Sequence, residues 1–396
     1  MAAKITFFQV GNGDMTLLRL ADTRVTTILI DINIRVAADN PNVELPNVAQ
    51  ALRKRLIVDK DGRPFVDAFL LSHPDQDHCR GLIDHFWLGD PADYPDDNLD
   101  QDKKRILIRE LWSSPLIFRR RSENHTLCKD AIAFDKEARR RVKYWRTYRS
   151  ASSGNRILIM GEDIKGKTDD LSHIVIKSGA KFSRIDGEDY STFFTAHLLA
   201  PAPHDEDENL EERLSKNESS VVMNMEISQS MFSTSKTRFL SGGDAAVLIW
   251  ERMWDRFKDT PEVLEYDLLL APHHCSWRTL SYDSWSEKGE DAKLNVGAHN
   301  ALSQAREGAT IVSSSKEIID DDVDPPNIRA KREYKAILKD VDGWFGCTGD
   351  LNDEAVLEFT VESGGKVKRL AVAAALTGSV TNSVASAAAP RAGIEK

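Results

Sequence analysis

Short apolar runs bounded by Gly, Pro, Asp and Ser recur along the chain and alternate with longer amphipathic stretches. The runs predict strands near residues 4–10, 15–20, 26–32, 66–71, 156–160, 195–200, 219–227, 237–241, 266–271 and 309–313, and a final hairpin at 355–361 and 366–372. The amphipathic stretches predict helices near 46–57, 245–257 and 326–339, and in part of 105–150. Strands that alternate with helices in two similar halves favour an α/β fold arranged as a four-layered αββα sandwich.

The densest group of polar side chains follows the apolar run at 66–71. Within six positions the sequence places His73, Asp75, Asp77 and His78. Imidazoles and carboxylates packed at the end of a buried strand are costly unless a cation compensates them, and a pair of metal ions is the simplest candidate. The alternative is an Asp-rich turn that caps the next helix.

Two distant segments end in the same chemistry. Residues 238–244 form an apolar run that closes in Gly-Gly-Asp with Asp244. Residues 266–276 form another, which closes in the pair His273 and His274. Each segment therefore places a ligand-competent side chain just past the carboxyl end of a predicted strand.

In this order the three segments resemble the metal motifs of the metallo-β-lactamase fold superfamily. The form His-Pro-Asp-x-Asp-His, followed by Gly-Asp and Pro-His-His-x-Ser, is similar to the hydrolase domain of the ComEC-type competence proteins and their soluble relatives. The opening residues 10–14 and the segment 217–222 resemble that family's Val-Gly-Gln-Gly-Asp start and Asn-x-x-Ser strand entry. The sequence departs from the pattern at Asn12, where Gln is usual, and at Cys275, where Gly is usual.

The resemblance implies two divalent ions, either Mn²⁺ or Zn²⁺. It places one ion on His73, Asp75 and Asp244, and the second on Asp77, His78, Asp244 and His274. Asp75 stands where most of the superfamily has His, and this makes the site richer in oxygen and favours Mn²⁺. Asp77 is a catalytic candidate through the water that its ion activates. His273 is a second, as a proton donor to the leaving group, with support of its neighbour as the alternative.

Several further positions are candidates of lower weight. Asp14 is predicted at the rim of the site as a substrate contact, unless it serves only the turn. Asp31 ends an apolar run and is expected to orient a metal-binding histidine. Ser219 and Lys316 are candidate substrate contacts, with a strand start and an ordinary polar turn as the alternatives. His197 is considered as a further ligand, although a core or edge histidine is favoured.

Charge is unevenly distributed along the chain. The net charge of −10 argues against a nucleic-acid partner, yet residues 119–149 hold eleven Lys or Arg against four Asp or Glu, with aromatic residues between them. Cations interleaved with flat rings suit a phosphate backbone and its bases, so Arg139, Arg140 and Arg141 are candidate contacts to nucleic acid. A solvated helix is the alternative. This stretch belongs to a helical, basic insert expected at about 87–150.

Length and composition set the remaining bounds. We expect one hydrolase domain over residues 1–372 and a flexible tail over 373–396, which is mostly Ala, Ser, Val, Thr and Gly. No apolar run approaches the ~20 residues that span a bilayer, so no membrane partner is expected. Four scattered cysteines and the lack of a signal region indicate the cytoplasm.

The sequence therefore predicts a metal-dependent phosphodiester hydrolase, and above all a nuclease acting on DNA or RNA. One alternative is a regulatory or interaction protein with a vestigial hydrolase core. Another is a small-molecule phosphodiesterase that acts on a cyclic nucleotide. A partner protein encoded in the same operon, for example in DNA processing or antiphage defence, is compatible with a nuclease and with a regulatory protein.

Overall fold

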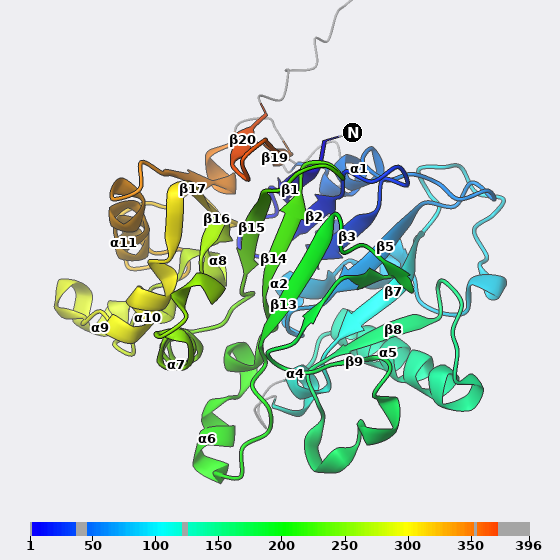
Figure 1. Ribbon diagram of the computed structural model, residues 1–396, viewed down its shortest axis with the longest axis horizontal. Coiled ribbons are helices and arrows are strands. Elements are labelled where there is room, and N and C mark those ends of the chain that lie inside the picture. The colour runs from blue at the N-terminus through cyan, green and yellow to red at the C-terminus, as the bar shows by residue number, and fades with distance from the viewer. Residues whose placement is uncertain (1, 37–45, 121–125, 352–354, 371–396) are drawn as a thin grey trace, which may run out of the picture.

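The computed structural model describes residues 2–36, 46–120, 126–351 and 355–370, and two large mixed sheets dominate them (Figure 1). The first sheet has the order β20-β19-β1-β2-β3-β5-β7-β8-β9, and β6 pairs with β7. Pairing is antiparallel from β20 to β3 and parallel from β3 to β9. Its strands are β1 (Lys4–Phe8), β2 (Thr16–Arg19), β3 (Thr27–Ile30), β5 (Phe65–Leu70), β6 (Phe86–Trp87), β7 (Ile106–Ser113), β8 (Arg156–Met160), β9 (Val175–Ile176), β19 (Val356–Val361) and β20 (Val367–Arg369).

The second sheet repeats this plan with the order β10-β13-β14-β15-β16-β17-β18. It is antiparallel from β10 to β15 and parallel from β15 to β18. Its strands are β10 (Lys181–Phe182), β13 (Phe194–Ala200), β14 (Val222–Ser228), β15 (Lys236–Ser241), β16 (Tyr266–Leu270), β17 (Ala305–Ser313) and β18 (Trp344–Cys347). The short strands β4 (Ile32–Asn33), β11 (Arg184–Ile185) and β12 (Glu188–Asp189) lie outside both sheets.

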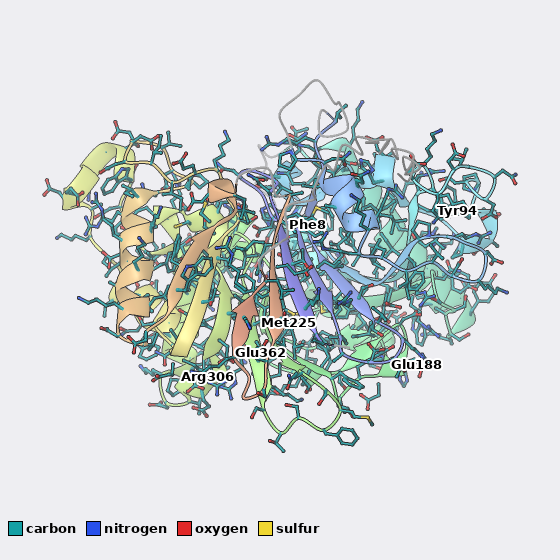
Figure 2. All side chains as sticks on the ribbon, turned by 90° about the horizontal axis from the view of Figure 1, so that it is seen from above. Phe8, Tyr94, Glu188, Met225, Arg306 and Glu362 are labelled. Atoms are coloured by element: carbon teal, nitrogen blue, oxygen red, sulfur yellow. The ribbon has the colours of Figure 1, made fainter. Side chains whose placement is uncertain are left out.

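The two sheets pack against each other, and both views show them side by side (Figures 1 and 2). Side chains alternate across a strand, so neighbouring residues enter different cores. On β16, Leu268 belongs to the core shared with the first sheet, whereas Leu269 faces the helices beyond the second sheet. Phe7 of β1 meets Phe239 of β15 edge to face across the central layer, with ring centroids 5.8 Å apart.

Helices cover the outer sides of both sheets (Figure 1). Helices α7, α10 and α11 cover the second sheet, and α5 packs beside β8 of the first. The helices are α1 (Val48–Arg53), α2 (Gln76–Cys79), α3 (Leu82–His85), α4 (Pro115–Arg119), α5 (Lys129–Tyr148), α6 (Glu208–Arg213), α7 (Val247–Phe257), α8 (Pro272–Cys275), α9 (Trp285–Lys288), α10 (Val296–Leu302) and α11 (Ile328–Lys339). Single 3₁₀ turns, among them η5 (Lys216–Ser219), connect several of these elements.

The α/β class predicted from the sequence is confirmed, as are the predicted strands and helices, with boundaries moved by a few residues. The insert expected at 87–150 is only partly helical, because it also contains β7 in the interior of the first sheet. That strand is almost entirely buried and has no polar alternation to reveal it. The predicted tail at 373–396 lies outside the described residues. No helix in the described part of the chain combines the length and apolar character that crossing a bilayer requires.

The parallel strands determine where functional loops gather. β5 and β7 run in parallel in the first sheet, and β15 and β16 do so in the second. Their carboxyl ends therefore open toward shared edges, and the loops after β5, β15 and β16 are the ones in which the sequence places its candidate ligands.

Candidate metal centre

The first group of candidate ligands is held by a short loop and one helical turn after β5. His73 and His78 are completely buried, while Asp75 and Asp77 keep part of their side chains exposed. Asp75 is the N-cap of α2, and its backbone carbonyl accepts a hydrogen bond from the N–H of His78. The turn thus directs several polar side chains to one point, which an extended loop would not do.

The second group comes from the loops after β15 and β16. Gly242 and Gly243 form the turn before α7 and present Asp244, which is 3% exposed. His273, His274 and Cys275 adopt left-handed backbone conformations, with φ values of 51°, 54° and 67°. Such conformations cost about 1–3 kcal/mol for a non-glycine residue and persist only where the surroundings impose them. Strain concentrated on a histidine pair is typical of a functional site.

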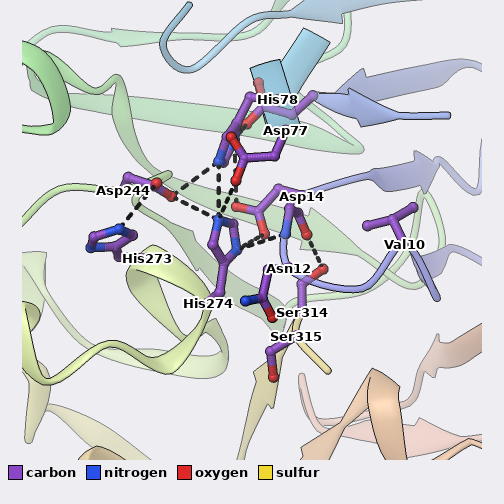
Figure 3. Close-up of polar contacts among 12 residues, drawn as sticks. Val10, Asn12, Asp14, Asp77, His78, Asp244, His273, His274, Ser314 and Ser315 are labelled. Atoms are coloured by element: carbon purple, nitrogen blue, oxygen red, sulfur yellow. Dashed lines mark hydrogen bonds and ion pairs between the residues drawn. The ribbon is translucent and has the colours of Figure 1, made fainter. Parts of the chain in front are cut away.

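Asp244 lies between two groups of side chains (Figure 3). Its Oδ1 atom is 3.1 Å from His78 Nε2 and 3.5 Å from His274 Nε2. Asp77 Oδ2 completes this group, 3.4 Å from His274 Nε2.

The other carboxylate oxygen, Asp244 Oδ2, faces a different set of side chains. It is 3.5 Å from His73 Nε2 and 3.6 Å from His273 Nε2. Asp75 Oδ2 lies 3.8 Å from the same His73 nitrogen. One carboxylate thus faces ligand-competent side-chain atoms on both of its sides.

Two further carboxylates support the imidazoles from behind. Asp31 Oδ2 lies 2.8 Å from His78 Nδ1 and also accepts a hydrogen bond from the Ser72 hydroxyl. Asp14 Oδ1 lies 3.4 Å from His274 Nδ1. Asp14 also falls within the set Asp14, His78, Asp244 and His274, whose nearest ligand atoms all lie within 4.8 Å of one another, so this set could hold a metal ion. Because Asp14 faces the Nδ1 atoms, it is better placed to orient the rings than to join Asp244.

Burial opposes charge on these groups, but opposite charges nearby outweigh it. Burial would raise the pKa of Asp244, yet the adjacent imidazoles hold that pKa well below its usual value. Burial would lower the pKa of His78 and His274, yet Asp244 and other carboxylates raise the first well above its ordinary value and the second to about 10. Burial lowers the pKa of His273. Without a metal, protonated imidazoles thus neutralise the carboxylates, and a bound divalent ion would displace those protons.

Two atoms at the centre have unused bonding capacity. Within the described residues, His73 Nε2 and Asp244 Oδ1 are buried and have no hydrogen-bond partner. A buried polar atom without a partner costs about 1–3 kcal/mol, and both atoms point into the cluster. A cation between these side chains would satisfy them, so the donor set fits a metal.

One candidate substrate contact, Ser219, lies in the turn η5 just before β14. Ser219 is fully buried, so it does not present a surface to substrate in this structure. Asn217, two residues earlier in η5, instead reaches the cluster, with its Nδ2 atom 3.4 Å from His273 Nε2. Asn217 was not predicted as a site residue, although the Asn-x-x-Ser motif at 217–220 was a signal that could have indicated it.

Two other candidates lie outside the cluster. Lys316 has an exposed side chain, and its backbone N–H donates to Asn12 Oδ1 at 3.0 Å, which places it beside the loop that carries Asp14. His197 lies on β13, where its Nε2 atom is 3.0 Å from the Gly179 carbonyl oxygen. His197 thus lies within the second sheet, between β10 and β14, which agrees with the favoured interpretation of a core or edge histidine.

Of the three arginines of α5 predicted to contact nucleic acid, the prediction is wrong for Arg141, which is too buried to do so. Arg141 is 1% exposed; it donates to Glu137 Oε1 at 2.7 Å and to backbone carbonyl oxygens of β7 and β8. Arg140 is partly buried and also donates to Glu137. Only Arg139 is largely exposed, and it pairs with Asp135 one turn earlier. The charge of Arg141 therefore serves packing, because its guanidinium supplies donors to buried carbonyl oxygens of the sheet.

Comparisons with known proteins add little. No family model matches the chain, and no curated protein matches it. Among solved structures, a protein of unknown function from Enterococcus faecalis V583 is 11% identical, with 89% of this chain and 78% of that chain covered and a TM-score of 0.28. A score this low carries no argument about fold or activity, so the resemblance to the metallo-β-lactamase superfamily stays a prediction.

Proposed function

We propose that this protein is a metal-dependent phosphodiester hydrolase, a nuclease, built on the four-layered αββα sandwich of the metallo-β-lactamase superfamily. The observation that carries the proposal is the position of Asp244, whose two oxygens face separate groups of imidazoles and carboxylates. The fold supports it as well, because each sheet is half antiparallel and half parallel and each is flanked by helices. Asp75 in place of a histidine favours phosphodiester over lactam chemistry.

The ligand set follows from the two groups. The proposed first ion is held by His73, Asp75 and Asp244, and the second by Asp77, His78, Asp244 and His274. Two divalent ions at this place would lower the pKa of a water and stabilise the charge that develops during an in-line displacement.

The chain's own residues would prepare the site for that chemistry. Asp31 and Asp14 hold the Nδ1 sides of His78 and His274, so that the Nε2 atoms face Asp244. His273 is 13% exposed at its side chain and adjoins Asp244 Oδ2. Burial lowers its pKa and so favours the neutral imidazole, which can bind a metal; giving a proton to the leaving oxygen would require the protonated ring.

The decisive experiment compares Asp244→Asn with Asp267→Asn. Asp267 is a matched control: it is also a buried aspartate, but it lies near the amino end of β16, where it pairs with Arg306. We expect wild type and the control to hold about two ions per chain after loading with Mn²⁺ or Zn²⁺, as measured by elemental analysis. Both should hydrolyse bis(4-nitrophenyl) phosphate and DNA.

Asp244→Asn should lose metal and slow hydrolysis about 10³-fold or more, since ~4 kcal/mol of charge stabilisation disappears. A well-folded wild type without metal, or full turnover by Asp244→Asn, would contradict the proposal. Hydrolysis of the small diester without cleavage of DNA or RNA would instead support a small-molecule phosphodiesterase.

A further inference from the structure

A pocket lined partly by cations lies beside the loop 11–14, which also reaches the metal centre. Its volume is about 300 Å³. Its lining includes Val10, Gly11, Asn33, Arg35, Ser315 and Lys316. The two cations come from segments far apart in the chain, so only the tertiary fold brings them to one cavity.

Arg35, Arg80 and Lys316 bring three positive charges to this region. Within the described residues, Arg35 Nε and Arg80 Nε are buried without a hydrogen-bond partner, and no ion pair neutralises Arg35, Arg80 or Lys316. Burial, followed by the neighbouring positive charge of Arg80, lowers the pKa of Arg35. Glu317 is the one carboxylate among the described lining residues. Two adjacent guanidiniums without counter-charge are costly, and a bound anion would relieve that cost.

The backbone of the pocket is shaped to keep Arg35 in place. Arg35 Nη2 donates to the Val10 carbonyl oxygen at 2.9 Å. Gly11 has φ of +76°, and a side chain there would collide with the same guanidinium. The close approach of Arg35 to the loop therefore requires a glycine.

One loop connects this pocket to the metal centre. Gly11 lines the pocket, whereas the backbone nitrogen of Gly13 lies 3.3 Å from His274 Nδ1 and Asp14 adjoins the same ring. Asn12 between them accepts a hydrogen bond from the Lys316 N–H. Three residues of extended chain span at most ~11 Å, so the two sites are within reach of neighbouring groups of one polyanionic chain.

We propose that the pocket formed by Arg35 and Lys316, with Arg80 beside it, binds a phosphate that flanks the phosphodiester held at the metal centre. The inference rests on the proposed function and narrows its substrate to a polynucleotide with successive phosphates. The shared chemistry is the sugar-phosphate backbone, so DNA and RNA both qualify.

The test uses the full-length protein as purified and a fluorescent phosphorothioate oligothymidylate, which resists hydrolysis. Binding is followed by anisotropy as a function of salt concentration. Lys316→Met and Arg35→Met should each weaken binding about tenfold and reduce the log–log salt slope by ~0.7, the value for one phosphate contact on a single strand. Lys103→Met, which removes an exposed lysine just before the amino end of β7, is the matched control and should change neither quantity.

A kinetic arm examines the substrate preference. The ratio of kcat/KM on oligothymidylate to kcat/KM on bis(4-nitrophenyl) phosphate should fall at least tenfold in Lys316→Met, because KM for the oligonucleotide rises while kcat stays the same. Lys316 has an exposed side chain, so this variant carries the test if Arg35→Met fails to fold. Affinity and salt slope equal to those of Lys103→Met would overturn the inference. Binding is measured without turnover, so a lack of hydrolysis would count against the proposed function alone.

Discussion

Replacing Arg141 should lower the protein's free energy of unfolding and should not act by weakening a nucleic-acid surface. Its guanidinium donates to Glu137 Oε1 at 2.7 Å and to backbone carbonyl oxygens at 2.9 and 3.0 Å. In Arg141→Ala these carbonyl oxygens lose a donor inside the protein, where water does not replace it. Glu137 keeps its hydrogen bonds to Arg140, so its carboxylate still has a charged partner.

The magnitude follows from these contacts. Two unsatisfied buried carbonyls cost about 1–3 kcal/mol each, and breaking a buried ion pair costs about 3–5 kcal/mol when the partner is left alone. Because Glu137 still pairs with Arg140, we expect Arg141→Ala to lower the free energy of unfolding by about 4 kcal/mol in total. Arg139→Ala removes only an exposed pair one helical turn apart and should cost ~0.5 kcal/mol or less.

Urea unfolding followed by circular dichroism measures the difference. With an m value of ~3 kcal/mol per M, a loss of about 4 kcal/mol moves the midpoint by about 1.3 M. Arg141→Lys keeps the charge but not the planar set of donors, so it should recover only part of the loss. The reasoning is refuted if Arg141→Ala is as stable as Arg139→Ala. It is also refuted if Arg141→Ala keeps full stability and binds DNA less tightly.

Three further predictions test other parts of the structure. Asp31→Asn should lower metal affinity about 10–100-fold in competition with a chromophoric chelator, since His78 loses its orienting carboxylate; unchanged affinity would remove Asp31 from the site. Burial raises the pKa of Glu110 to about 7, so the folded state holds a proton more tightly and loses stability as pH rises from ~4.5 through 7. The free energy of unfolding of Glu110→Gln, relative to that of wild type, should therefore rise by on the order of 2 kcal/mol from pH 5 to pH 8. A difference between the two proteins that does not change with pH would exclude the titration of Glu110 as the cause. The Sγ atoms of Cys79 and Cys128 lie 3.4 Å apart, so diamide should link them into one intramolecular disulfide visible by mass spectrometry, unless α2 and α5 are packed differently.

The sequence alone determined many elements of the fold and most of the cluster around Asp244. Both signals are local: alternation on a strand follows from its pleat, and a side chain just past an apolar run lies at the strand's carboxyl end. This pattern marked His73, His78, Asp244 and His274 as able to bind a metal, the family resemblance implied that they do, and the structure brings them together. The strand β7 was missed because burial on both faces removes the alternation that reveals a strand.

The tertiary structure alone decided what the charged residues face. Arg139 and Arg141 stand two positions apart on one helix, yet one is exposed and the other supports the backbone of the sheet. Asp14 was expected at the rim and instead touches the ring of His274, while Arg35 and Lys316 share a pocket although they are far apart in the chain. Composition reports how many charges a segment carries. Whether a charge faces solvent, a carbonyl oxygen or another charge depends on neighbours brought from distant segments, and no local pattern encodes them.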